Sequence, residues 1–507
     1  MKKSVKLIAA LLLASMLLSS AAACSQDSGT QTETTAAADE TTTQAAETGP
    51  KIDEYGREIV ECELPDNLDY KGMEVRFIVR DNPKYSIDFA VDGQNGEIVN
   101  DTVYDRNRAV EEELNVVIKN HKVADDSTSV QDAIITTVTA GDNAYDVGAF
   151  YQFYAGNIAT SGAMYNLLDI NTIDSEKPWW SEEFFTELEY NGKIFLSAGS
   201  MNLSVTSMLM GIAFNQKKVI DYYDDYKFLY NEVYDGKWVF DRMTELSKDV
   251  YSDLNGNSTV DEGDFFGMAT VEDNHGSWVT HFNIRSVTKD NSGVPQLTLF
   301  NEKTVNAYNK LYQYYRQSEG VYFAKKGFDQ AKYFAGGNAL FTNCTFYDSE
   351  TTLRDMEDPY GILPMPKYDE AQDGYKNVAH DNSNLIGVVS NTKDPEAVGA
   401  VLELMNYYSY LDLEPAYFEV AMKQKYLMDS DSAKMFDLIV DGIMADFGCQ
   451  YSLMLSGGKY NLRTIYYGSV RNNLRIDNPD YVSAYTANED LYKTSLASFL
   501  SALDAVK

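Results

Sequence analysis

An α/β protein of two lobes, each built on a parallel sheet with helices on its faces, is the fold class that this sequence predicts. Short runs rich in β-branched and aromatic residues alternate with amphipathic helical segments, as they do in βαβ units. The stretch from about residue 51 to residue 507 is too long for one small core and suits two lobes. A polar stretch and, before it, a short apolar segment precede this folded part.

Strands and helices are expected to alternate because the period of the apolar residues changes between two and about 3.6. The first elements are predicted as a strand at 72–80, a helix at 100–114, a strand at 116–118, a helix at 129–140 ended by Gly141, and a strand at 145–150. Later elements are predicted as strands at 193–198, 208–215 and 361–366, and as helices at 241–251, 301–319 and 395–409. The part beyond 395 is expected to be mostly helical.

The first 24 residues have the pattern of a secretory signal. Three lysines lie within the first six residues, residues 7–18 are apolar, and three alanines precede Cys24. The apolar run is short for a transmembrane span. Two interpretations compete: cleavage at an A-x-A site with Cys24 incidental, or a lipoprotein signal in which Cys24 is lipidated and becomes the mature N-terminus.

The residues after Cys24 favour the second interpretation. Residues 25–50 contain no aromatic residue and no Ile, Leu, Val or Met, so they cannot bury enough apolar surface to offset their ordering entropy. We predict a disordered Thr/Ala/Glu-rich tether over 24–55. A tether that starts directly after a cysteine favours a lipid anchor at Cys24, although Ala21 stands where such signals usually have Leu. Residues 1–23 are then a lipoprotein signal peptide.

The chain carries a formal net charge of −35. Nucleic acids and anionic membrane surfaces are polyanions, so this charge disfavours both as partners. It is compatible with neutral or cationic ligands and with bound cations. Beyond Cys24 the cysteines are Cys62, Cys344 and Cys449, an odd number that allows at most one disulfide, and no Cys/His cluster indicates zinc.

Several phrases spread over most of the folded part resemble one known family. They are YDRNRAVEEELNVVI (104–118), YDVGAF (145–150), LLD (167–169) with KPWW (177–180), EYNGKIFLSAGSMN (189–202), GKW (236–238), FAGGNALF (334–341) and GILPMPK (361–367). In number and order they resemble the extracellular solute-binding proteins of bacterial ABC importers, specifically the family 1 sugar-binding, maltose-binding-like group.

The resemblance implies a two-lobe periplasmic-binding-protein-like fold of type II, with hinge crossings and a ligand cleft between the lobes. Lobe 1 would comprise 56–203 and 340–383, and lobe 2 would comprise 204–339 and 384–507, with crossings near 199–207, 337–342 and 381–385. It also implies a carbohydrate ligand, ABC permease subunits as partners, and a lipid-anchored place on the extracellular face of the membrane of a Gram-positive type bacterium. We expect a monomer.

Sugar recognition requires flat apolar surfaces for C–H faces and planar groups that bind hydroxyls. Position at strand ends and crossings selects the ligand candidates, which are Tyr151, Gln152, Ser200, Asn202, Trp278, Asn343, Phe346, Asp381 and Asn382, with His380 beside the last two. Packing in the core is the competing interpretation for each of them. Trp278, in a polar loop with a glycine, Asp381 and Tyr151 are the strongest candidates. Trp179 and Trp180 are expected to form a packed surface corner.

The loop DLNGNSTVDEGD (253–264) has the spacing of a calcium-binding loop. Its oxygen-bearing residues at loop positions 1, 3, 5, 7, 9 and 12 are Asp253, Asn255, Asn257, Thr259, Asp261 and Asp264. Ser258 replaces the usual glycine at position 6, where it strains the turn, and Asp264 is one methylene shorter than the usual glutamate. A polar loop whose Asn and Asp side chains only cap turns is the alternative. A structural calcium ion is favoured.

No catalytic pattern stands out in the chain. Its four histidines are not at metal-ligand spacing, and there is no G-x-S-x-G and no phosphate loop. We therefore expect no enzyme activity and no catalytic cofactor. Capture of a carbohydrate, expected to be an oligosaccharide, is the favoured function; the alternatives are a binding protein for a peptide or polyamine, a carbohydrate-processing enzyme, and a surface adhesin.

Overall fold

The computed structural model describes residues 51–380, 382–426, 429–451 and 464–506. The predicted signal peptide, Cys24, the tether up to residue 50 and Asp381 lie outside the described residues. No helix within the described ranges has both the length and the apolar content needed to span a bilayer. The three cysteines of the folded part, Cys62, Cys344 and Cys449, are all free thiols.

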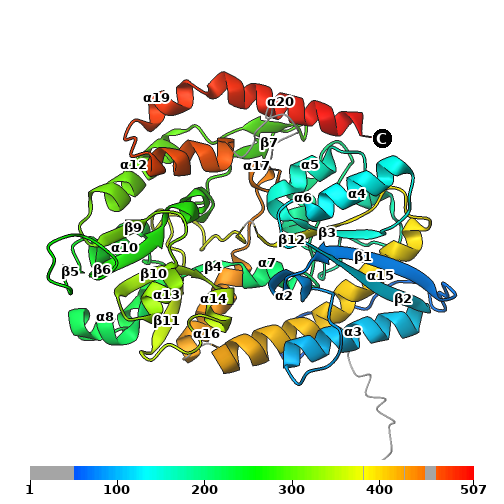
Figure 1. Cartoon of the computed structure of the whole chain (residues 1–507), viewed down its shortest axis with the longest axis horizontal. Helices are drawn as coiled ribbons and strands as arrows, with labels where there is room; N and C mark the ends of the chain where they lie inside the picture. Colours follow the sequence, from blue (N-terminus) through cyan, green and yellow to red (C-terminus); the bar gives the residue numbers. More distant parts are fainter. Residues whose placement is uncertain (1–50, 381, 427–428, 452–463, 507) are drawn as a thin grey trace, which may run out of the picture. The chain divides into compact units, whose positions relative to one another are not determined.

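The first sheet has the strand order β12-β3-β1-β2. Its strands are β1 (Met73–Arg80), β2 (Val116–Val123), β3 (Val147–Tyr151) and β12 (Asn384–Val388). β1 pairs in parallel with β2 and β3, whereas β12 pairs antiparallel with β3. Helices α3 (Ile98–Leu114) and α15 (Pro395–Tyr408) lie together on one side of this sheet, and α4 (Ser129–Ala140) lies on the other (Figure 1).

The second sheet has the order β11-β4-β10-β6-β5, with β9 also paired to β6. Its strands are β4 (Met210–Asn215), β5 (Tyr251–Ser252), β6 (Phe265–Val271), β9 (Val321–Ala324), β10 (Ala339–Thr345) and β11 (Tyr360–Pro364). β6 is parallel to both β9 and β10. The helices of this half are α8 (Gln216–Tyr223), α9 (Lys227–Tyr234), α10 (Phe240–Ser247), α12 (Glu302–Gln317), α13 (Gln330–Ala335), α14 (Phe346–Glu350) and α16 (Ser430–Asp441).

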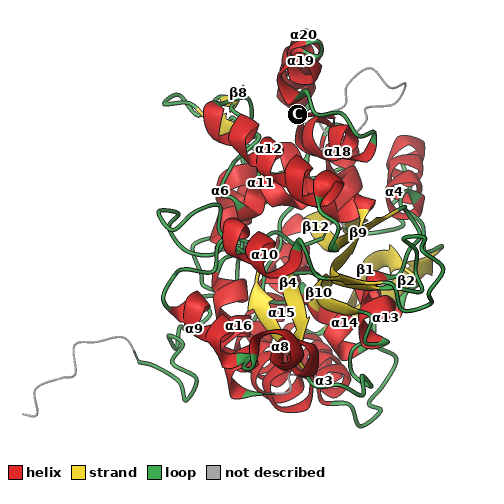
Figure 2. Cartoon of the chain, turned by 90° about the vertical axis from the view of Figure 1, so that its left-hand side faces the viewer, coloured by secondary structure: helices red, strands yellow, loops and turns green. Residues whose placement is uncertain are grey.

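A hairpin and the C-terminal helices form a third group. The hairpin pairs β7 (Val287–Lys289) with β8 (Pro295–Leu297), and α20 (Glu489–Ala505) packs on it. α18 (Asn473–Arg475) and α19 (Tyr481–Thr486) contact α12, and Figure 2 shows these helices at one end of the chain. The remaining short segments are α2 (Pro83–Ser86), η1 (Gln152–Tyr154), α5 (Ala155–Ala159), η2 (Leu167–Asp169), α6 (Glu182–Leu188), α7 (Leu203–Ser207), η3 (Glu272–Ser277), α11 (Trp278–His281), η4 (Ser409–Leu413), η5 (Ala416–Tyr426), α17 (Phe447–Gln450) and η6 (Thr464–Asn472).

The two-lobe α/β prediction is confirmed, and most predicted elements lie within two or three residues of observed ones. The helix predicted at 129–140 has the observed bounds, because Gly141 ends it in the left-handed conformation with a φ of 76°. The predicted strand at 193–198 is an exception. Ser197 forms only an isolated bridge to Ile386 there, so the segment runs along the first sheet without joining it as a strand.

The sheet pairings reverse the predicted division of the second half of the chain. Residues 340–383 were assigned to lobe 1, but β10 and β11 pair with β4 in the second sheet. Residues from 384 onward were assigned to lobe 2, but β12 pairs with β3 in the first sheet and α15 packs beside it, whereas α16 packs on β11 as that assignment predicted. The chain therefore passes from the first sheet to the second through α7, as predicted near 199–207, returns between β11 and β12, and passes to the second sheet again between α15 and α16. The predicted crossing at 337–342 is wrong, because β6, β9 and β10 belong to one sheet.

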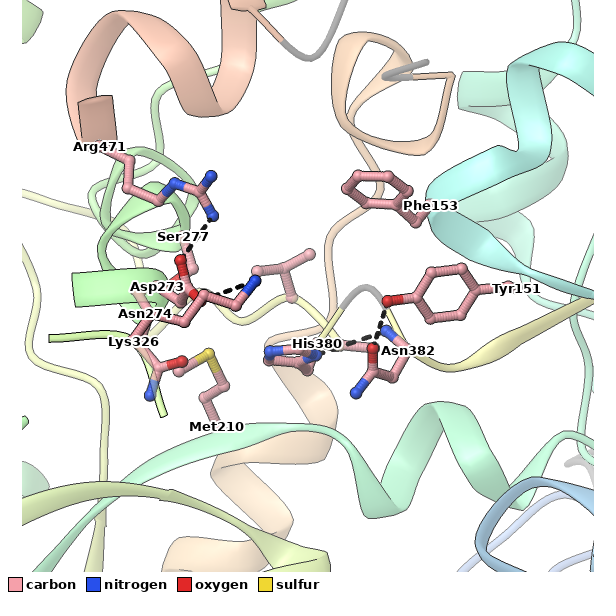
Figure 3. Close-up of a pocket in the computed structure, with 12 residues that line it drawn as sticks. Tyr151, Phe153, Met210, Asp273, Asn274, Ser277, Lys326, His380, Asn382 and Arg471 are labelled. Carbon is pink, nitrogen blue, oxygen red and sulfur yellow. Dashed lines mark hydrogen bonds and ion pairs between the residues drawn. The ribbon is translucent and has the colours of Figure 1, made fainter. Parts of the chain in front are cut away.

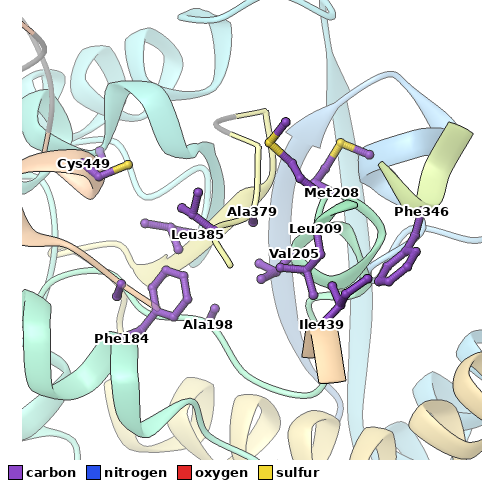
Figure 4. Close-up of a cluster of buried hydrophobic side chains, with 14 of the residues drawn as sticks. Phe184, Ala198, Val205, Met208, Leu209, Phe346, Ala379, Leu385, Ile439 and Cys449 are labelled. Atoms are coloured by element: carbon purple, nitrogen blue, oxygen red, sulfur yellow. The ribbon is translucent and has the colours of Figure 1, made fainter. Parts of the chain in front are cut away.

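The first crossing is packed into the core. Figure 4 shows Val205, Met208 and Leu209, in and just after α7, among buried side chains that include Leu385 of β12, Phe346 of α14 and Ile439 of α16. A side chain at Gly199 would not fit, because its Cβ would lie 2.3 Å from Asn406 Oδ1 and 2.6 Å from the carbonyl oxygen of Trp179. The position of the crossing segment is therefore set by close packing on all sides.

A buried hydrogen-bond network joins the two crossings. Asp88 is fully buried, and its carboxylate accepts from Ser204 N at 2.7 Å, Ser204 Oγ at 2.6 Å and Asn384 Nδ2 at 3.1 Å. Ser204 lies in α7, where the chain leaves the first sheet, and Asn384 begins β12, where it returns. Arg80, the last residue of β1, donates through Nη2 to Asn384 Oδ1 at 3.1 Å. Leaving such buried groups without partners would cost about 1–3 kcal/mol each.

Buried carboxyls give the fold a pH dependence. Burial raises the pKa of Asp88 to about 6, and of Glu350, Glu403 and Glu414 to about 7. Raising the pH from about 6 to about 8 is expected to lower the melting temperature. The native state holds protons that the unfolded chain releases between the ordinary and the raised pKa, so this contribution to stability is complete below the ordinary pKa and is lost as the pH rises through about 6 to 7.

Two histidines act in the opposite direction. Burial lowers the pKa of His275 to about 3 and of His281 to about 4, so they reduce stability as the pH falls below their ordinary 6.5. They are outnumbered by the four carboxyls in the tested range. Thermal melts followed by circular dichroism at the two pH values measure the effect, and Glu414→Gln, which removes one of these protons, should flatten it. A melting temperature that rises toward pH 8 would contradict the prediction.

Candidate functional site

A cavity of about 270 Å³ lies where strands of both sheets end. The residues that line it are Tyr151, Phe153, Met210, Asp273, Asn274, Ser277, Lys326, Val378, Ala379, His380, Asn382 and Arg471. Tyr151 ends β3, Asp273 follows β6, and Lys326 follows β9. Ligands of open α/β sheets bind outside the carboxyl ends of parallel strands, and this cavity has that position in both sheets.

One side of the cavity is aromatic. Tyr151 and Phe153, whose ring centroids are 5.7 Å apart, lie on one side of the site in Figure 3. The hydroxyl of Tyr151 donates to Asn382 Oδ1 at 2.6 Å. The guanidinium of Arg80 lies 4.7 Å from the centre of the Tyr151 ring and 3.8 Å from that of Tyr85. These contacts hold the Tyr151 ring in place and present a flat apolar surface.

The opposite side is charged. Asp273, in η3, forms ion pairs with Arg471 Nη1 at 3.4 Å and with Lys326 Nζ at 3.6 Å. Figure 3 shows both cationic side chains directed at this carboxylate. Asn274 and Ser277 of the same short helix also line the cavity. One carboxylate between two cations leaves this side with a net positive charge.

His380 and Asn382 lie between the two sides. They belong to the segment through which the chain returns to the first sheet, and the backbone N–H of Asn382 donates to His380 Nδ1 at 3.4 Å. Both residues also line a second cavity of about 150 Å³, together with Met210 and Asn274, so the two cavities adjoin. The further residues of the second cavity are Lys84, Met208, Gln330, Asn343, Cys344, Thr345 and Asp348.

Three of the predicted ligand residues lie at these cavities. Tyr151 and Asn382 line the first, and Asn343 lines the second, where its side-chain oxygen accepts a hydrogen bond from Thr270 Oγ1. Gln152 directly follows Tyr151 but is fully buried, and its Oε1 accepts from Ser383 Oγ at 2.8 Å. Gln152 therefore supports the site from behind. The choice of residues at strand ends and crossings therefore found three residues that line these cavities.

Ser200, Asn202 and Phe346 lie elsewhere. Ser200 and Asn202 line a separate cavity of about 230 Å³ beside α7, and Asn202 is 2% exposed, with its Oδ1 accepting from Gly199 N at 3.0 Å. Phe346 is 1% exposed and packs on Phe436 with ring centroids 4.5 Å apart. These residues stabilise the crossing and the core, because a segment that connects two lobes needs its own packing.

Trp278 is a core residue, and the expectation that a tryptophan in a polar loop is not core is wrong. It is 2% exposed and packs against Phe240, Phe282 and Tyr315. Asp273, Asn274 and Ser277 of this loop line the cavity, whereas His275 is buried and Trp278 begins α11 and turns inward. Trp179 and Trp180 are also buried, and their indole N–H groups both donate to Glu403.

The charged side of the cavity was missed by the sequence analysis. Asp273 could have been found, because it follows an apolar strand in the same way as Tyr151. Lys326 also follows a strand, yet β9 is only four residues long and was not predicted. Arg471 comes from η6, about 200 residues later in the chain than Asp273, and no local pattern connects the two.

The predicted calcium loop lies between β5 and β6. Asp253 accepts from Gly256 N at 2.7 Å and from Ser258 N at 2.9 Å, and Asp261 accepts from Asn255 Nδ2 at 2.9 Å and from Asn257 Nδ2 at 2.7 Å. Ser258 has a φ of 58°, which is the strain expected where such loops usually have glycine.

Asp264 is the last residue of this loop. It is fully buried, and its Oδ2 accepts from Asp261 N at 3.1 Å and Tyr251 OH at 3.0 Å, whereas Oδ1 has no hydrogen-bond partner. Among the residues that the structure describes, no three His, Cys, Asp or Glu side chains converge as metal ligands. Binding a cation would therefore require Asn255 and Asn257 to turn their oxygens inward, and the calcium ion stays a prediction.

No model of a known protein family matches the chain, and no curated protein matches it. Among solved structures, the galacto-N-biose-/lacto-N-biose I-binding protein of the ABC transporter from Bifidobacterium longum, in complex with lacto-N-biose, has a TM-score of 0.52 at 10% identity, over 85% of this chain and 98% of that one. Maltose-bound MalE3 of T. maritima has a TM-score of 0.49 at 12% identity, over 84% and 99%. The GacH receptor of Streptomyces glaucescens has a TM-score of 0.48 at 13% identity, over 86% of this chain and 100% of that one. The likeness to the B. longum protein shows the predicted two-lobe, periplasmic-binding-protein-like fold.

The core position of Trp278 can be tested by truncation. Trp278→Ala is expected to lower the free energy of unfolding by about 3–5 kcal/mol, because it removes a buried ring from a close-packed aromatic cluster. Urea denaturation followed by tryptophan fluorescence measures the loss. As a matched control, truncation of the exposed Leu254 (61% exposed) to alanine should change the free energy by less than about 0.5 kcal/mol. A small effect of Trp278→Ala would return this residue to the ligand candidates.

Proposed function

We propose that this chain is the substrate-binding lipoprotein of an ABC importer, capturing a carbohydrate in the cavity between Tyr151 and Asp273 without chemical conversion. Cys24 anchors it to the extracellular face of the membrane, and the bound sugar passes to permease subunits. The observation that supports the proposal best is the cavity itself. An aromatic surface on one side and polar or charged groups on the other suit the C–H face and the hydroxyls of a sugar ring.

The position of the cavity is consistent with capture by closure. Its walls come from strand ends in both sheets, and two of its residues, His380 and Asn382, lie in the segment that connects the sheets. Affinity for a ligand that contacts both sides favours the conformation in which the sides are close. The structural relative from B. longum, which shares the fold, is a sugar-binding protein of an ABC transporter.

A calcium ion in the loop 253–264 remains part of the proposal. The spacing of its oxygens supports it, and so does the buried oxygen of Asp264 that has no partner among the described residues. The ion would hold the loop that connects β5 to β6 in one conformation. Both strands belong to the sheet that carries the charged side of the cavity. Its role would be structural.

Ligand capture can be tested with a panel of mono- and oligosaccharides, peptides and polyamines. A saccharide is expected to raise the melting temperature without being converted, because it binds only the native state. Tyr151→Ala is expected to weaken its binding about tenfold through loss of the aromatic surface. The control is Tyr222→Ala, an exposed tyrosine of α8. Turnover of the saccharide would indicate an enzyme, and stabilisation by peptides or polyamines alone would exclude the sugar.

Calcium binding can be tested with a chelator. Removing calcium is expected to lower the melting temperature by several degrees, because the ion is bound by the folded loop alone. Asp253→Asn and Asp261→Asn should abolish the response, whereas Asp249→Asn, an exposed residue just before β5, should keep it. If neither calcium nor chelator changes the melting temperature, the structural calcium ion is excluded.

A further inference from the structure

Among the described residues, the two adjoining cavities are lined by more basic than acidic side chains, in a strongly acidic chain. The basic side chains that line them are Lys84, Lys326 and Arg471, and the described carboxylates that line them are Asp273 and Asp348. The chain as a whole has a net charge of −35, so random placement would make a cavity negative. A cleft of opposite sign concentrates ligands of the other charge.

Lys84 is the basic side chain that lines the second cavity, and no carboxylate forms an ion pair with it among the described residues. Its side chain is half-buried, and Nζ lies 4.1 Å from the centre of the Tyr347 ring and 5.6 Å from that of Tyr85. Burial lowers the pKa of Lys84 below its ordinary value, whereas Asp348, Glu350 and Asp125 raise it only through space. Among the described residues, Lys84 therefore contacts aromatic faces but no carboxylate at ion-pair distance.

The carboxylates near Lys84 are engaged elsewhere. Asp348 caps α14, with Oδ2 accepting from Thr345 N at 2.7 Å and from Thr345 Oγ1 at 2.9 Å. Glu350 accepts from the hydroxyl of Tyr417, and burial raises its pKa to about 7, so part of it is neutral near that pH. Neither side chain forms an ion pair with the ammonium group of Lys84.

Arg80 adds a second cation beneath the aromatic surface. Its guanidinium is 4% exposed and lies between the rings of Tyr85 and Tyr151. Its Nη2 donates to neutral acceptors, Asn382 O at 2.6 Å and Asn384 Oδ1 at 3.1 Å. Arg80 donates to these neutral acceptors, and Asp88 and Asp125 act on it only through space, so its charge also reaches the nearby cavity, where the low dielectric strengthens it.

We propose that the ligand is an acidic saccharide, whose carboxylate or sulfate group lies against Lys84 while a ring lies on Tyr151. This inference rests on the proposed capture of a carbohydrate and names its class. A neutral sugar can be bound by hydrogen bonds without net charge, so it gives no reason to keep an under-compensated ammonium in the cleft. An anion forms charge-assisted hydrogen bonds with that ammonium, and these are the stronger kind.

The test compares three sets of probes on the full mature chain by isothermal titration calorimetry. They are oligomers of a hexuronic acid, the matched neutral hexose oligomers, and sulfated hexose oligomers. We expect one of the two acidic sets to bind at least about tenfold tighter than the neutral set, with an affinity that falls as salt is raised. The acidic set that binds more tightly identifies the carboxylate or the sulfate as the recognised group.

Variants locate the anionic group. Lys84→Met is expected to weaken binding of the acidic probe at least about tenfold. The ligand-free melting temperature should stay unchanged or rise, because the substitution removes a desolvated charge. Lys84→Arg should restore most of the affinity. Lys493→Met, an exposed lysine of α20, is the control and should bind like the unmodified protein.

The outcomes separate this inference from the function on which it rests. Tighter binding of neutral oligomers would overturn the acidic ligand and leave carbohydrate capture standing. No binding of any saccharide would overturn both. Acidic probes that bind equally well to the unmodified protein and to Lys84→Met would overturn the placement of the anionic group at Lys84.

Discussion

The hydrogen bonds of Asp88 are the constraint on which the arrangement of the site depends. The carboxylate is buried and accepts from Ser204 in one connecting segment and from Asn384 in the other. Asn384 in turn accepts from Arg80, which supports the ring of Tyr151. An uncompensated carboxylate in this position would be strongly unfavourable, so the two crossings and the end of β1 hold one another in register. The aromatic side of the cavity is built directly on this network.

The cavity takes its chemistry from strand ends that are distant in the sequence. β1, β3, β6, β9 and β10 all end toward it, so each contributes a residue or a short helix. The aromatic groups and Lys84 come from the first sheet and the segment that follows β1, whereas Asp273 and Lys326 come from the second sheet, so the cavity has walls from both. The fold gathers Lys84, Lys326 and Arg471 at these cavities, although the chain as a whole has a net charge of −35.

Local patterns predicted local structure well. The helix at 129–140 was identified from its periodicity and its terminal glycine, and the end of β3 was identified as a ligand position. Errors arose where the answer depended on partners far along the chain. β10 and β11 are apolar strands that could join either sheet, and only their pairing with β4 decides which. Trp278 was misplaced because the sequence shows a polar loop but not the aromatic cluster of α10 and α12 into which the ring turns.

The sequence by itself determined the alternation of strands and helices, the two-lobe α/β class, and some of the segments that end at the cavity, because these depend on periodicity and on residues within a few positions of one another. Tertiary structure alone decided the order of the strands, the path between the sheets, and the meeting of Arg471 and Lys326 at Asp273. Those features are set by packing and by charge pairing across some 50 to 200 residues, and nothing in the local sequence records which partner each side chain meets.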